Sequence, residues 1–130
     1  MNITGTGDLS VTGTAGNNDP TSYGIQFVDD TQLTLSGTSN SFIADRIEIG
    51  PSNVGINSGA NAVSIRQLTN SRSINLGGAD SAAELGLTDA ELDRITAGTI
   101  NIGDANSGLI SVAGVISPAN YKTLSVQKGV

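Results

Sequence analysis

Pairs of aliphatic residues separated by one position recur along this chain at nearly regular intervals of 22 to 27 residues. Three of them read aliphatic-x-aliphatic-Gly, and they lie at Ile47–Gly50, Ile74–Gly77 and Ile100–Gly103. Related pairs without the glycine are Ile25/Phe27 and Leu124/Val126. A two-residue alternation predicts short strands with one buried face. A near-constant period between such strands is typical of a solenoid, in which each coil lays its strand on the previous one.

A second internal match has a similar spacing. The hexapeptide Leu9–Thr14 aligns with Leu33–Thr38, which begins 24 residues further along the chain. A β-sandwich would also contain many short strands between turns, but it would not require a fixed period. The sequence therefore predicts an all-β fold, a single-stranded right-handed parallel β-helix of about five coils, with the hand taken from the general preference of parallel crossovers.

The order of the strands within each repeat predicts three sides for the coil. The first sheet would contain Ile25, Ile47, Ile74, Ile100 and Leu124 with their i+2 partners. The second would contain Leu9, Leu33, Val54, Leu85 and Ile110. A third, less regular side would contain Phe42/Ile43, Val63/Ile65, Leu92/Ile95 and Val115/Ile116. Columns of aliphatic side chains would then fill the core, which fits an aromatic content of only 3%.

Residues 81–97 interrupt the period and predict a short helical insertion. Ser81–Glu84 is a candidate capping box with Gly86 as its stop, and Thr88–Glu91 is a better one that would lead into about two helical turns. The alternative for this segment is a strand on the third side followed by a long loop.

The residue types that carry most catalytic and metal chemistry are missing. The chain has no His and no Cys, which removes the usual general base, imidazole and thiolate metal ligands, and disulfides. A net charge of −6 argues against nucleic acid and against an anionic membrane surface as partners. No apolar run approaches the roughly 20 residues of a membrane span. We therefore expect no catalytic, cofactor-binding or metal-binding residues, no cofactor and no membrane insertion.

A polysaccharide-processing β-helix is the main alternative class. The predicted outward row of the first sheet is Gln26, Glu48, Asn75, Asn101 and Ser125, which contains one carboxylate. A two-carboxylate hydrolytic site needs two acids roughly 5 to 10 Å apart. The adjacent pair Asp29 and Asp30 does not supply one, because neighbours in a strand point to opposite sides, and it predicts a solvated turn.

Two further motifs are better explained by turns. Gly77–Asp80 only partly matches the glycine- and aspartate-rich loop of calcium-binding β-rolls and does not recur, so it predicts a coil corner. Thr4–Thr6 and Thr12–Thr14 have the Thr-x-Thr form of ice-binding ladders, but neither recurs at the coil period along the rod.

The run Ser73–Gly77, then Leu85–Ile95, then Thr99–Gly103 resembles repeats of the large bacterial filamentous-haemagglutinin-like surface proteins. The earlier segments Tyr23–Ile25 and Leu33–Gly37 are similar to other repeats of the same proteins. The resemblance covers most of the chain. It implies a right-handed β-helix, an exported protein at the bacterial cell surface, and a role in surface display or adhesion.

These observations predict a non-catalytic shaft segment of a secreted adhesin. We expect residues 1–130 to form one β-helix segment excised from a much longer repeat protein, with Met1 an added start residue and no visible signal peptide. Its partners would be neighbouring repeats and host or surface glycans. Unpaired strands at either end also predict end-to-end self-association. The alternative function is carbohydrate binding or polysaccharide processing, for which Glu48 is the residue to test.

Overall fold

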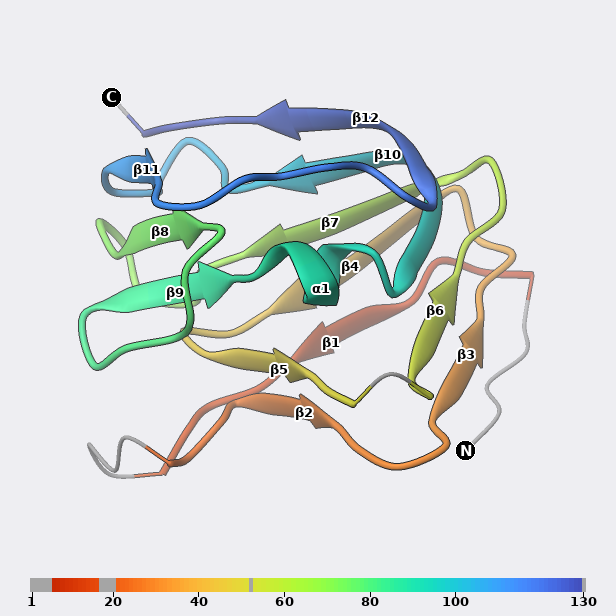
Figure 1. Cartoon of the computed structure of the whole chain (residues 1–130), viewed down its shortest axis with the longest axis horizontal. Helices are drawn as coiled ribbons and strands as arrows, with labels where there is room; N and C mark the ends of the chain where they lie inside the picture. The colour runs from red at the N-terminus through yellow and green to blue at the C-terminus, as the bar shows by residue number, and fades with distance from the viewer. Residues whose placement is uncertain (1–5, 17–20, 52, 130) are drawn as a thin grey trace.

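The computed structural model describes residues 6–16, 21–51 and 53–129 (Figure 1). Thr4 and Gly5 of the first Thr-x-Thr motif lie outside these ranges. Within them the chain is all-β apart from one short helix, as predicted. The strands are β1 (Ser10–Thr12), β2 (Ile25–Phe27), β3 (Gln32–Thr34), β4 (Ser39–Ile43), β5 (Ile47–Ile49), β6 (Gly55–Asn57), β7 (Ala62–Arg66), β8 (Ser73–Leu76), β9 (Glu84–Leu87), β10 (Ile95–Ile102), β11 (Ile110–Val112) and β12 (Tyr121–Val126), and the helix is α1 (Asp89–Leu92).

Every strand pairing in the described ranges is parallel. The largest sheet has the order β1-β4-β7-β10-β6-β3, with β12 also paired to β10, and it curls into a half-barrel. Two smaller sheets have the orders β11-β8-β9 and β2-β5. We call the five successive stretches of chain that begin at β1, β4, β7, β10 and β12 tiers one to five; they follow one another from the red to the blue side of Figure 1.

The inner faces of the sheets form aliphatic columns. On the large sheet, Val63, Ile100 and Leu124 align across three neighbouring strands, and Ile100 is fully buried. Elsewhere Leu33 aligns with Ile56. Phe27 and Phe42, two of the four aromatic residues in the chain, meet edge to face with ring centroids 5.5 Å apart. Burial of these side chains is the main stabilising term of the fold.

Some of the predicted columns are confirmed. Ile25 aligns with Ile47, as the first predicted sheet requires, and Phe42 aligns with Ile65 on the predicted third side. Ile110 is predicted on a different side from Ile74, but it aligns with Ile74 in the structure.

Leu33 lies beside the strand that follows Val54, as the second predicted sheet requires, although it is opposite Ile56. The remaining predicted columns are wrong because the tiers differ in length. Ile100 and Leu124 align with Val63 and not with Ile47 or Ile74. The matching hexapeptides do not stack either, since Ser10 aligns with Ser41, 31 residues later. The next long interval, 37 residues between Ser64 and Asn101, contains β8 and β9, which pair with each other, whereas the prediction places Ile74 and Leu85 on different sides of the coil.

The predicted helical insertion is half right. Thr88 caps α1, its side chain accepts the amide of Glu91, and the Glu91 side chain accepts the amide of Thr88, so the capping box is confirmed. The helix is only four residues long, about one turn and not two. Ser81 accepts the amides of Ala83 and Glu84 in a turn, and the chain then enters β9. The alternation of Leu85 and Leu87, both fully buried, outweighs the local capping signal.

The recurrent glycine after a strand has a conformational reason at two of its three positions. Gly77 and Gly103 follow β8 and β10 with φ of 81° and 78°, in the left-handed region that favours glycine. A Cβ on Gly77 would also lie 2.6 Å from the backbone nitrogen of Gly114 in the adjacent tier. The motif therefore indicates where the chain leaves a strand closely packed against its neighbour.

Candidate functional site

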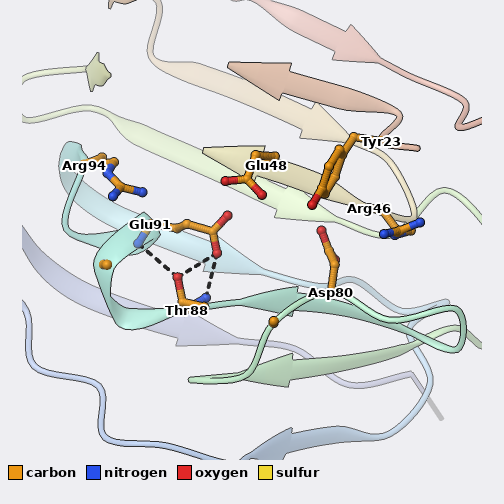
Figure 2. Close-up of a pocket in the computed structure, with 9 residues that line it drawn as sticks. Tyr23, Arg46, Glu48, Asp80, Thr88, Glu91 and Arg94 are labelled. Atoms are coloured by element: carbon orange, nitrogen blue, oxygen red, sulfur yellow. Dashed lines mark hydrogen bonds between the residues drawn. The ribbon is translucent and has the colours of Figure 1, made fainter. Parts of the chain in front are cut away.

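A cavity of about 270 Å³ lies between β5 and the segment that contains β9 and α1 (Figure 2). Figure 2 shows the side chains of Glu48, Asp80 and Glu91 around the same space, with Tyr23 and Arg46 at one end and Arg94 at the other. The complete lining is Tyr23, Arg46, Glu48, Ala79, Asp80, Thr88, Ala90, Glu91 and Arg94.

The cavity exists because the backbone ladder is interrupted beside β5. Among the described strands, β5 pairs with β2 alone. On its other edge the amide of Ile47 donates to Asp80 Oδ2 at 3.0 Å, and the amide of Ile49 donates to Glu91 Oε1 at 3.1 Å. Two carboxylates thus accept the bonds that the carbonyl groups of a third strand would otherwise accept.

The second oxygen of each carboxylate is bonded on the opposite side. Asp80 Oδ1 accepts the amide of Gly86 in β9 at 2.7 Å. Glu91 Oε2 accepts the amide of Thr88 at 2.9 Å and its hydroxyl at 2.8 Å. The side chains of Asp80 and Glu91 therefore each connect β5 of the second tier to the third tier by hydrogen bonds. Glu91 is 8% exposed, so an unbonded carboxylate there would be strongly destabilising.

Tyr23, Arg46 and Glu48 form the outer part of the cavity. The Arg46 guanidinium lies over the Tyr23 ring, 5.1 Å from its centroid, in a cation–π contact. Burial and a hydrogen bond with Glu48 raise the pKa of the Tyr23 hydroxyl, so it stays protonated near neutral pH. At the far end Arg94 donates to the carbonyl of Ile49. The cavity therefore combines three carboxylates and two guanidinium groups beside one aromatic ring.

Burial raises the pKa of Asp80 to about 7. The negative charge of Glu91 acts in the same direction, whereas the amides of Gly86 and Ile47 and the charge of Arg46 lower it. A carboxyl group that titrates near neutrality is a feature of general acids, although buried structural carboxylates show it too.

Asp80 should titrate with a midpoint near pH 7 in the folded protein, against 3.8 for an ordinary aspartate. Between these two values the folded state holds a proton that the unfolded chain has released. The contribution of Asp80 to the free energy of unfolding therefore falls as the pH rises through this window, and it is constant above it. The difference in stability between the wild type and Asp80→Asn, measured by urea denaturation at pH 4 to 8, isolates this contribution from that of the other acids.

Carboxyl-carbon NMR resolves the same titration directly. Glu91→Gln should lower the Asp80 midpoint, because it removes a negative charge that raises the pKa. Asp29→Asn is the matched control, since Asp29 is an exposed acid outside the cavity lining and should leave the midpoint unchanged. A midpoint near 4 in the wild type, or no response to Glu91→Gln, would contradict this account.

The sequence predicts no functional site. The structure brings together several polar residues that the sequence pattern does not place near one another. Glu48, the single carboxylate of the predicted outward row, lines the cavity together with Asp80 and Glu91. The other members of that row do not line the cavity. Gln26 lies in β2 and aligns with Glu48 of β5, while Asn75 and Asn101 lie in two other sheets. The capping box was the local signal for Glu91, but nothing local indicated its bond to Ile49.

The remaining candidates lie where turns were expected. Asp29 and Asp30 are exposed in the turn between β2 and β3. Gly77 lies in a corner, and the side chain of Asp80, three residues later, lines the cavity.

Within the described ranges, no group of three acidic side chains is placed to hold a metal ion. No helix there is long and apolar enough to cross a membrane.

Comparison of the chain with family models, curated proteins and solved structures finds no match.

Proposed function

We propose that the chain is a structural shaft segment of a secreted bacterial surface adhesin, built as a right-handed parallel β-helix of about five coils. The parallel pairing of successive tiers and the aligned aliphatic columns support this proposal. The resemblance of its motifs to filamentous-haemagglutinin-like repeats supports the adhesin context. Neighbouring repeats would then be its main partners, and the outer surface of the cell its location.

The observation that carries the proposal is the use of the acidic side chains. Five aspartates each accept a backbone amide from the adjacent tier, so they join tiers at the corners. The pairs are Asp8 with Ser39, Asp45 with Leu68 and Thr69, Asp80 with Ile47, Asp89 with Ser117, and Asp93 with Ala119. Carboxylates that accept backbone amides from a neighbouring tier stabilise the stacking of the tiers. A rod that transmits force or holds a tip away from the cell needs such ties along its length.

The second candidate function is carbohydrate binding or processing, and one observation favours it. A neighbouring hollow of about 340 Å³ shares Tyr23, Glu48 and Arg94 with the cavity and adds Gln26. An aromatic ring beside planar polar side chains is a chemistry that suits sugar hydroxyls. Glu48 lines both spaces, and its carboxylate accepts a hydrogen bond from the Tyr23 hydroxyl.

A glycan array combined with a lyase and hydrolase screen separates the two functions. The shaft proposal predicts no turnover and no glycan signal that depends on Glu48. The test pair is Glu48→Gln and Glu84→Gln, because Glu84 lies on β9 outside the lining of both hollows. Turnover that Glu48→Gln abolishes and Glu84→Gln leaves intact, with both variants folded by circular dichroism, would favour the enzyme and overturn the shaft.

A further inference from the structure

The charges of this chain are separated along its length. In the sequence, the first 44 residues contain four aspartates and no basic residue. The stretch from residue 105 to the C-terminus contains Lys122 and Lys128 and no acidic residue. Asp8, just before β1, and Asp29 and Asp30 in the first tier are exposed, and both lysines are exposed in the fifth. The tiers lie at opposite sides of the molecule, where β2 and β12 are drawn in Figure 1. The stack therefore has an acidic end and a basic end.

The basic end also exposes apolar side chains. Six large hydrophobic residues in the described ranges are exposed, and four of them belong to the last two tiers. They are Leu109 at 62%, Val112 at 68%, Val115 at 81% and Val126 at 46% exposure. Within the described ranges, β11 and β12 each pair along one edge only. An apolar face beside free strand edges is the surface on which another strand or tier would bind.

The acidic end differs from it in one respect. Its strands β1, β2 and β3 are also paired along one edge only among the described strands. The core residues of β2 and β3 are covered, however, with Leu33 at 2% and Ile25 at 6% exposure, and Val28 at 49% is the one exposed large hydrophobic residue in the described part of the first tier. The two ends are thus not equivalent, since the acidic end exposes less apolar surface than the basic end.

We propose that the basic fifth-tier end of one copy of this chain binds the acidic first-tier end of a second copy, head to tail. Opposite charges face each other in this arrangement, whereas joining two basic ends would bring four lysines together with no acid between residue 105 and the C-terminus of either copy. A head-to-tail contact leaves both outer ends free, so it propagates into an open-ended filament. Such binding depends only on the two end surfaces, and it holds whether or not the chain serves as an adhesin shaft.

Sedimentation velocity of the purified chain over a hundredfold range of concentration tests the proposal. The expected result is a series of species whose mean size grows with concentration and falls when salt is raised from 50 to 500 mM, since salt screens the charges between the ends. A monomer at every concentration would overturn the proposal. A dimer that does not grow further would also overturn it, because that result indicates a symmetric contact.

Charge variants show which ends meet. Lys122→Glu with Lys128→Glu makes the basic end acidic, and Asp29→Lys with Asp30→Asn removes most of the negative charge of the acidic end, so each variant keeps one wild-type end. Asparagine is chosen at position 30 because its φ is 57°, a conformation that Asn tolerates. Each double variant alone should associate roughly tenfold more weakly than the wild type, and an equimolar mixture of the two should recover association. Variants that fold and associate like the wild type, or a mixture that recovers nothing, would contradict head-to-tail binding.

An apolar pair completes the test. Val112→Lys adds a charge to the apolar face of the basic end and should weaken association about as much as the charge variants. Leu68→Lys is its control, because Leu68 is 37% exposed in the corner between β7 and β8, away from both ends. Equal effects of the two substitutions would count against the basic end as the binding surface.

Discussion

Ile100→Ala is expected to lower the free energy of unfolding by about 2 to 5 kcal/mol, the usual range for a fully buried aliphatic residue. Ile100 is fully buried in β10, and its neighbours in the column are Val63 and Leu124. Strands on both sides prevent the column from collapsing into the space left by the lost atoms, so a cavity should remain. Urea denaturation followed by circular dichroism measures the change.

Val112→Ala is the matched control. Val112 also lies on a strand and loses methyl groups, but it is 68% exposed, so the change should remain within about 0.5 kcal/mol. If the two substitutions have similar effects, or if Ile100→Ala costs less than about 1 kcal/mol, the aligned columns do not stabilise the fold in the way described.

Glu91→Ala should have the second large effect, a loss of about 2 to 4 kcal/mol. The substitution removes the acceptor of the Ile49 amide and of the Thr88 amide and hydroxyl. The Ile49 amide would then lack a partner inside the protein, and the capping box of α1 would be broken. Hydrogen exchange should accelerate at Ile49 and Thr88, which separates this local effect from general destabilisation.

Two variants control for Glu91→Ala. Glu91→Gln keeps a carbonyl oxygen that can accept one of these bonds, so it should cost clearly less than the alanine. Glu84→Ala removes an acid on β9 whose carboxylate accepts, among the described residues, a single 3.3 Å bond from Asn75, and it should change stability by less than about 1 kcal/mol. Equal losses for Glu84→Ala and Glu91→Ala would contradict a special role for the buried carboxylate.

The sequence predicts the kind of fold better than its register. Alternation at Ile47, Ile74 and Ile100 correctly predicts strands with a buried face, because that pattern is local. It does not predict which strands lie side by side, since this depends on the length of chain in each tier. The strands of Ile74 and Leu85, predicted on different sides of the coil, pair with each other as β8 and β9, and Ile100 aligns with Val63 and not with Ile74.

The cavity was beyond sequence reasoning for a similar reason. The Thr88–Glu91 capping box joins residues only three positions apart and is predicted from the sequence, whereas Asp80 and Glu91 bind the amides of Ile47 and Ile49, which lie 33 and 42 positions away. Only the folded tiers bring these groups together. The raised pKa of Asp80 follows from the same burial, so it too could not be predicted from local pattern.

The central claim is that successive tiers stack in parallel with β10 between β7 and β12. Backbone nuclear Overhauser effects between amide and α-protons test it most directly. We predict contacts from Asn101 in β10 to residues around Ser64 in β7 and around Ser125 in β12. Because the strands are parallel, residues further along β10 should contact residues further along β7 and β12. Contacts from β10 to residues 73–76 instead, as the predicted first sheet requires, or contacts in antiparallel order, would contradict the stacked account.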